Sequence, residues 1–200
     1  MNHQPGFSPR AFLRSRKAAL VHFSTVMAGR LDLTFPNDLR QAKTMKGVPL
    51  SFSTILAGDT NPHMAGRGGA EGSVGLLVDI GPDTVINSVS PDDSGSNVDG
   101  SLGLDPSDEN CKNSIDNRLT SNEWHVKDYV PVGIFLLAPI VVREVHEIGG
   151  ALTPIEVKIG LETILMHFPG ERVFSANERH SLSGIVLPAN GKLSAMTTCC

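Results

Sequence analysis

The sequence has few cysteines, no long apolar run and none of the common short catalytic motifs. Its three cysteines are Cys111 in a polar stretch and Cys199 and Cys200 at the end, an arrangement that offers no disulfide framework. No stretch approaches the roughly 20 apolar residues that span a bilayer. There is no P-loop, GxGxxG, HExxH, CxxC pair or GxSxG, so many nucleotide-binding, zinc-dependent and hydrolytic classes are excluded, and we expect no metal.

Excess positive charge is also absent. Seventeen Lys and Arg against 21 Asp and Glu give a net charge of −4, which argues against broad, nonspecific nucleic-acid binding. The basic residues Arg10, Arg14, Arg16 and Lys17 can be a solvated helix face or a phosphate-contacting arm. Residues 1–8 lack the features of a signal peptide, so we expect a cytoplasmic protein without membrane contact.

What is present suits one globular unit. The chain has 200 residues, 40% hydrophobic and 19% charged, which predicts a single domain over residues 1–200. Two polar, glycine-rich stretches, near 57–73 and 88–117, predict mobile loops. The pair Cys199 and Cys200 is either a functionless tail or a site for metal or lipid.

Hydrophobic periodicity predicts helices and strands in alternation, which indicates a mixed fold of helices and a β-sheet. The expected helices cover residues 9–18, 38–46 and 154–167. The expected strands cover residues 19–24, 50–56, 73–80, 123–126, 134–137 and 140–143, with a turn at 129–133.

Polar side chains within the apolar strands are the candidate site residues, because a buried polar group is costly unless it is bonded or used. His22 can be a satisfied structural histidine or a ligand contact. The hydroxyls of residues 51–54 can face solvent or a ligand. Glu123, beside the single tryptophan, can be an ordinary edge-strand residue, a general base or a stabiliser of positive charge.

Taken in order, these segments resemble the ADP-ribosyltransferase superfamily, and within it the DarT-like, DNA-targeting toxins of bacterial toxin–antitoxin systems. The resemblance spans about residues 20–143. Residues 20–25 are similar to the family's His-x-Thr strand. Residues 48–53 are similar to the strand that opens the second half of its pocket, and to the Ser-Thr-Ser element of the arginine-using branch. Residues 121–126 are similar to the catalytic glutamate strand, and residues 129–131 to the Pro turn after it.

The resemblance implies an α+β fold with a split, mixed or antiparallel sheet whose cleft binds NAD as substrate and transfers ADP-ribose, releasing nicotinamide. It implies that Glu123 stabilises an oxocarbenium-like state. Arg40 is the first candidate to hold the pyrophosphate, with Arg30, Arg67 and Arg118 as alternatives. The implied NAD-contacting residues are His22, Phe23, Ser24, Thr25, Arg30, Ser51, Phe52, Ser53, Thr54, Ser121 and Asn122.

Several functional alternatives stay open. The single tyrosine, Tyr129, lies beyond Glu123, unlike the His-Tyr-Glu branch, and hydroxyls replace the aromatic residues that the DNA-targeting toxins carry after Val48-Pro49. The resemblance therefore implies either a nucleic acid or a protein as acceptor, and a toxin or defence protein with a possible antitoxin or immunity partner. The other readings are NAD hydrolysis, an RNA 2′-phosphotransferase-like reaction, or a non-enzymatic α/β binding or immunity module.

Overall fold

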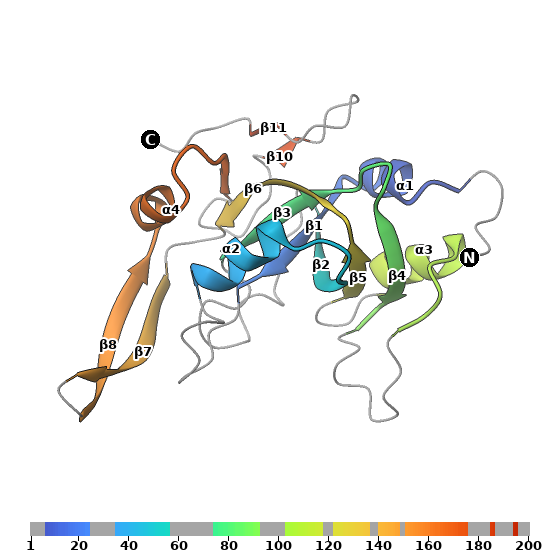
Figure 1. Ribbon diagram of the computed structural model, residues 1–200. Coiled ribbons are helices and arrows are strands. Elements are labelled where there is room, and N and C mark those ends of the chain that lie inside the picture. Colours follow the sequence, from blue (N-terminus) through green and yellow to red (C-terminus); the bar gives the residue numbers. More distant parts are fainter. Residues whose placement is uncertain are drawn as a thin grey trace.

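The fold is α+β, with a seven-stranded mixed sheet flanked by four helices (Figure 1). The computed structural model describes residues 7–24, 35–56, 74–92, 103–117, 122–136, 140–148, 151–175, 185–186 and 194–195. The helices are α1 (Pro9–Ser15), α2 (Asn37–Thr44), α3 (Asp108–Asp116) and α4 (Leu161–His167).

The large sheet has the strand order β4-β5-β2-β1-β3-β6-β9. Its strands are β1 (Ala18–Phe23), β2 (Leu50–Leu56), β3 (Val74–Asp79), β4 (Val85–Ser90), β5 (Glu123–Lys127), β6 (Val130–Leu136) and β9 (Val173–Ser175). All neighbouring strands are antiparallel except β6 and β9, which are parallel. The order places β1, β2 and β5 side by side although they lie far apart in the sequence.

One face of this sheet, the core face, packs with side chains from all four helices. Alternate residues such as Leu20, Phe52, Leu76 and Trp124 are at most 1% exposed and belong to one cluster. The helices add to that cluster the residues Phe12, Leu13, Leu39, Ala42, Cys111, Ile115, Ile164 and Phe168. Burying this much apolar surface is the main favourable term in folding.

The opposite face, the second face, is apolar at one end of the sheet. Val21, Leu77, Phe135 and Phe174 are fully buried and form a separate cluster. Gly75 lies beneath it, and a Cβ at this position would lie 2.5 Å from Val21 Cγ1, so only glycine permits the close packing. Toward β2, β5 and β4 the same face becomes polar.

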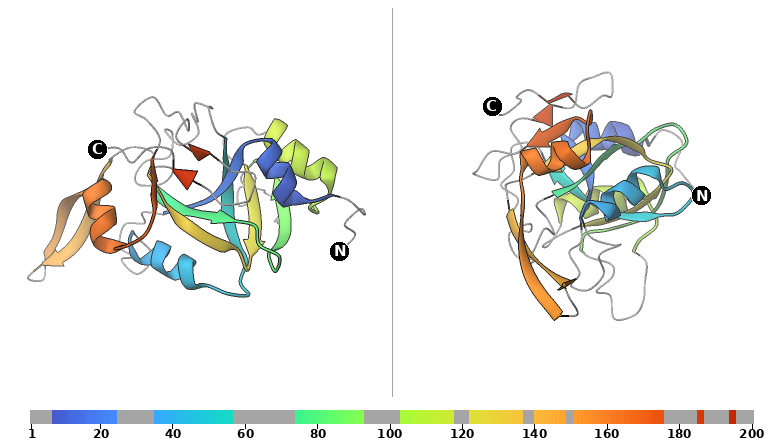
Figure 2. Two further views of the ribbon diagram at one scale, coloured as in Figure 1. Left: turned by 90° about the horizontal axis from the view of Figure 1, so that it is seen from above. Right: turned by 60° about the vertical axis from the view of Figure 1, so that its left-hand side comes forward.

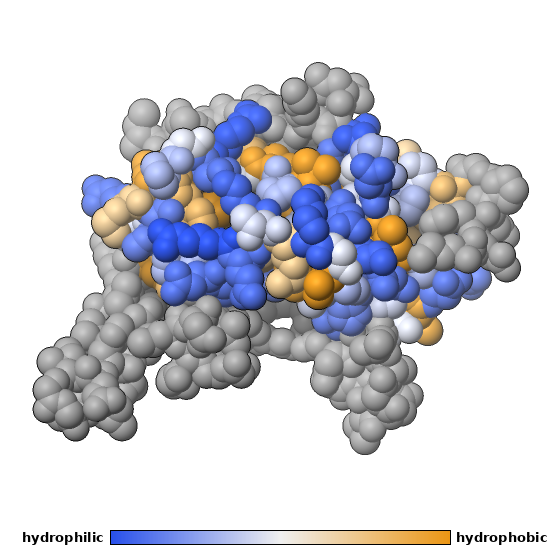
Figure 3. Space-filling view, in the orientation of Figure 1, coloured by the Kyte–Doolittle hydropathy of each residue, from blue (hydrophilic) through white to orange (hydrophobic). Residues whose placement is uncertain are grey.

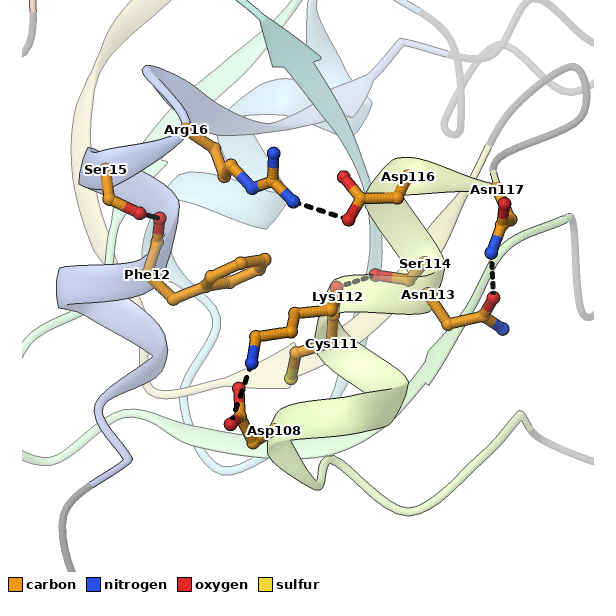
Figure 4. A network of polar contacts seen from close by, with 10 residues as sticks. All are labelled: Phe12, Ser15, Arg16, Asp108, Cys111, Lys112, Asn113, Ser114, Asp116 and Asn117. Carbon is orange, nitrogen blue, oxygen red and sulfur yellow. Dashed lines mark hydrogen bonds and ion pairs between the residues drawn. The ribbon is translucent and has the colours of Figure 1, made fainter.

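A polar contact joins the end of α1 to α3 beside the sheet (Figure 4). Arg16, which caps the end of α1, forms an ion pair with Asp116 of α3. Ser107 caps the start of α3 by accepting a hydrogen bond from the amide of Asn110 at 3.2 Å. These two contacts fix the ends of the helix that packs next to Trp124.

The prediction of a structureless stretch over residues 88–117 is wrong for most of the residues that the structure describes there. Strand β4 runs to Ser90, and α3 begins after Ser107. Serines alternate with apolar residues in β4 because one side of this strand faces the polar part of the second face. The other predicted loop, residues 57–73, lies outside the described residues.

The predicted helix over residues 154–167 is half wrong, because its first part is strand β8 (Ala151–Ile159). Ile155, Val157 and Ile159 alternate with charged residues, which is the period of a strand, and only α4 is helical. Strand β8 pairs with β7 (Ile140–Ile148) in a hairpin that extends away from the large sheet (Figures 1 and 2).

The predicted turn over residues 129–133 is mostly strand. Strand β6 begins at Val130 and includes Pro131. The sheet accommodates this proline because the register between β3 and β6 shifts at Leu77 and Val78, directly opposite it. The remaining pair of short strands is β10 (Ile185–Val186) with β11 (Ser194–Ala195).

The described surface on the side seen in Figure 1 is largely hydrophilic, with smaller hydrophobic areas between (Figure 3). In the part of the chain that the structure describes, the most exposed large apolar side chain is Met166 of α4, at 68%. Among the described residues, no helix has the length and apolar character needed to cross a membrane.

Candidate functional site

The candidate site is built on β5, whose alternation sends neighbouring side chains to opposite faces of the sheet. Trp124 and Val126 enter the core face and are fully buried. Glu123 and His125 therefore lie on the second face, between β4 and β2. One short strand thus carries a hydrophobic anchor on one side and an acid with a histidine on the other.

The Glu123 carboxylate is held by two neighbours. Ser51 of β2 donates its hydroxyl to Oε1, and His125 Nε2 lies 3.2 Å from the same oxygen. The side chain of Glu123 is only 11% exposed. The carboxylate therefore lies in a fixed, mostly desolvated position, where its charge acts more strongly than it would in water.

His125 has a second partner across the strand pair. Its Nδ1 lies 2.8 Å from the hydroxyl of Ser88, the residue opposite it on β4. The imidazole therefore bridges a serine and a glutamate through its two ring nitrogens. Ser88 is 7% exposed, so its hydroxyl is placed to orient the ring rather than to meet solvent.

Serines surround this glutamate on both neighbouring strands. Ser90 of β4 is the direct partner of Glu123, and Ser51 of β2 is the direct partner of His125. Ser53 is on the same face as Ser51 by alternation. We call Ser51, Ser53, Ser88, Ser90, Glu123 and His125 the serine–glutamate cluster. A carboxylate among hydroxyls can stabilise positive charge and hydrogen-bond a sugar.

His22 lies on the core face of β1 and not in the cluster. Its ring packs 5.7 Å from the ring of Phe52, and its Nδ1 lies 2.8 Å from the main-chain oxygen of Ser51. Burial lowers the pKa of His22, while the hydrogen bond to Ser51 and the charge of Asp38 act in the opposite direction. The neutral ring donates from Nδ1, because the Ser51 carbonyl can only accept.

Ser51 thereby connects the two predicted site residues. Its hydroxyl binds Glu123 and its carbonyl binds His22. The resemblance implies that His22 and Glu123 both contact NAD in one cleft, whereas strand alternation puts their side chains on opposite faces of the sheet. A ligand bound at the cluster would contact Glu123 directly, whereas His22 would affect that ligand indirectly, through its hydrogen bond to Ser51 of β2.

The other predicted contacts on β1 divide between the two faces in the same way. Ser24 is buried and donates to Asp38 of α2 at 2.6 Å, which ties the strand end to a helix. Phe23 lies on the second face, where its ring meets Phe135 edge-on with centroids 6.1 Å apart. Thr25 lies outside the described residues.

Asn122 and Thr54 form a buried lock on the core face. Asn122 accepts from the Thr54 amide at 2.8 Å and donates to the Ser114 carbonyl of α3 at 2.8 Å, besides bonding the Thr54 hydroxyl. Trp124 Nε1 donates to the Ser114 hydroxyl at 3.0 Å. These groups are at most 2% exposed and serve to join β2, β5 and α3.

Phe52 is a core residue for the same reason, since it is fully buried and its ring meets Tyr129 edge-on at 4.8 Å. The Tyr129 hydroxyl donates to the Ala42 carbonyl of α2 at 2.5 Å, and burial raises the pKa of Tyr129 to about 12. The structure therefore brings neither Phe52 nor the Asn122 lock into the serine–glutamate cluster.

Arg40 is directed toward α4 and not toward Glu123. Its guanidinium donates to the His167 carbonyl at 3.2 Å and lies 5.8 Å from the centre of the Phe168 ring. The structure therefore does not bring the predicted pyrophosphate arginine to the cluster. The alternatives Arg30, Arg67 and Arg118 lie outside the described residues, as does Ser121.

His125 and Ser88 were not among the predicted site residues. His125 stands two positions after Glu123, and the period of a strand puts both on one face, so His125 could have been predicted. Ser88 could not have been predicted, because its stretch lacks a strong strand pattern and its pairing depends on an irregularity between Ile86 and Ser88.

A shallow depression of about 330 Å³ lies at the other end of β5, beyond Lys127. It is lined by loop residues that include Lys46, Asp83 and Asp128, and by Val130 at the start of β6. Because Glu123 begins β5 and this depression follows its end, the depression is separate from the cluster.

Among the described residues, no group of three or more His, Cys, Asp or Glu side chains could hold a metal ion. No protein-family model, curated protein or solved structure matches the chain. The geometry of the cluster and the resemblance of its motifs are therefore the only grounds for inferring a function.

Proposed function

We propose that this protein is a mono-ADP-ribosyltransferase that cleaves the bond between nicotinamide and ribose in NAD. The observation that carries the proposal is the neighbourhood of Glu123. Three of the four segments with family-like motifs form the adjacent strands β5, β2 and β1, and Ser51 of β2 holds the Glu123 carboxylate. The strand order supports a shared site, because the motifs lie more than 20 residues apart in the chain.

The proposed chemistry follows from charge. As the glycosidic bond to nicotinamide breaks, positive charge develops on the ribose carbon and its ring oxygen. A carboxylate fixed nearby in a mostly desolvated position stabilises that charge without having to reorganise. Glu123 has both properties, and the surrounding serine hydroxyls suit the hydroxyls of a ribose.

His22 takes a different role from the one the resemblance implies. We propose that it supports β2 from the core face through the Ser51 carbonyl, and that the second face makes the NAD contacts. By the same resemblance, we propose a nucleic acid or a protein as acceptor, and a toxin or defence role within a cell.

A non-enzymatic binding module is the second candidate, because four predicted contact residues serve the fold. Ser24, Phe52, Thr54 and Asn122 are buried and engaged in the core. If the cluster around Glu123 is likewise structural, the protein should show no affinity for NAD.

A thermal-shift titration with NAD separates the two candidates. A ligand that binds only the folded state stabilises it by about 2.7 kcal/mol at 100 times its dissociation constant. We expect a concentration-dependent rise in melting temperature with NAD and a smaller one with nicotinamide alone. An unchanged melting temperature at millimolar NAD would favour the binding module.

The acceptor is identified with NAD labelled in its adenylate phosphate and incubated with separate DNA, RNA and protein pools. Transfer predicts label in one pool together with free nicotinamide. Free nicotinamide without a labelled acceptor would assign the protein to NAD hydrolysis. The absence of both free nicotinamide and labelled acceptor would contradict the proposal.

A further inference from the structure

The serine–glutamate cluster contains a histidine to which neither the motifs nor the proposed reaction assigns a role. His125 is 21% exposed and lies between two fixed partners. Its Nε2 is 3.2 Å from Glu123 Oε1, and its Nδ1 is 2.8 Å from the Ser88 hydroxyl. A neutral imidazole has one donor and one acceptor nitrogen, so these partners select between its two tautomers.

Only one tautomer satisfies all three groups. If Nε2 carries the proton, it donates to the carboxylate, and Nδ1 accepts from the Ser88 hydroxyl, which can donate. If Nδ1 carries the proton, the Nε2 lone pair faces a carboxylate oxygen and the two repel. We propose that His125 is a positioning residue for Glu123: it donates from Nε2 to the carboxylate, which selects this tautomer, while the Ser88 hydroxyl donates to Nδ1 and fixes the orientation of the ring.

The geometry gives this residue a defined task. Ser51 approaches Oε1 from β2 and His125 approaches the same oxygen along β5, so the carboxylate is fixed from two directions. A misplacement of about 1 Å in a reacting group can cost about 100-fold in rate. The effect on turnover rests on the function proposed above, whereas the tautomer can be measured without it.

The tautomer is tested by nitrogen NMR of the histidine side chains in the full chain. His125→Gln identifies the resonances of His125, because they disappear from its spectrum. We expect the proton on Nε2 at pH 8, and a gain of the Nδ1–H form in Glu123→Ala, which lacks the carboxylate acceptor, but not in the control Ser15→Ala, whose hydroxyl lies on α1. A ring protonated at Nδ1 in the wild type would overturn the proposal.

The effect on function is tested by nicotinamide release from NAD. His125→Ala should lower turnover about 10- to 100-fold with little change in KM. His125→Gln should recover most of it, because its amide can donate to Glu123. Equal losses in both variants would overturn the proposal. Should the wild type release no nicotinamide, the proposed function fails and the tautomer decides the role of His125.

Discussion

The two faces of strand β5 carry polar groups that differ in their hydrogen-bond partners and in their exposure to solvent. On the core face, Asn122 and the Trp124 indole bond to fixed partners in β2 and α3 and are at most 2% exposed. On the second face, Glu123 and His125 bond to each other and to serines at 11% and 21% exposure. Polar groups that join elements are sealed from solvent, whereas a site must stay within reach of a ligand.

The largest expected effect is a loss of unfolding free energy when a polar side chain on the core face is removed. Asn122→Ala leaves the Thr54 amide and the Ser114 carbonyl without the side chain that bonds them. Unsatisfied buried groups cost about 1 to 3 kcal/mol each, so we expect a loss of about 2 to 4 kcal/mol in unfolding free energy. Urea denaturation measures it.

The matched change on the other side is Glu123→Gln, which keeps an oxygen to accept from Ser51. We expect it to change the unfolding free energy by less than about 1 kcal/mol. Equal losses in Asn122→Ala and Glu123→Gln would break the comparison and make both sides structural.

A smaller effect depends on pH through His22. Burial lowers the pKa of His22 below its ordinary value of 6.5, so the unfolded chain binds more protons than the folded one just below that pH. Unfolding free energy should therefore rise with pH through this window and be lost as the pH falls below about 6.5. Denaturation midpoints from pH 5 to 8 measure the slope.

His22→Asn should flatten this slope, since Asn can donate to the Ser51 carbonyl but does not titrate. His167→Gln removes the other described histidine with a lowered pKa, which is caused first by burial and then by the charge of Arg40. A slope that survives in the double variant His22→Asn, His167→Gln would show that other groups control the acid sensitivity.

Local sequence patterns predicted the parts of the fold in which one residue type dominates a face. The strands near residues 18–23, 50–56 and 74–79 and helix α2 follow from apolar periodicity and the break at Gly47-Val48-Pro49. Strand β4 was missed because serines fill one of its faces. Helix α3 was missed because its short sequence is mostly polar, although Ser107 followed by two acids is a capping pattern.

The sequence predicted only part of the candidate site, and the reason is geometric. Glu123 and the β2 serines are visible as polar residues in strands, but which of them meet depends on register and on the face of each strand. The sequence offers no local feature that puts Ser88 opposite His125, since the register shifts between Ile86 and Ser88. Likewise, nothing near Arg40 indicates that its guanidinium packs on Phe168.

The most direct test of the central claim is the rate of nicotinamide release by Glu123→Gln. If Glu123 stabilises the developing positive charge, this variant keeps its fold and its NAD-induced thermal shift but loses at least about 100-fold in turnover, because a major electrostatic contribution is removed. Glu109→Gln, on the exposed side of α3, is the matched control and should retain wild-type turnover. Wild-type turnover in Glu123→Gln would contradict the account.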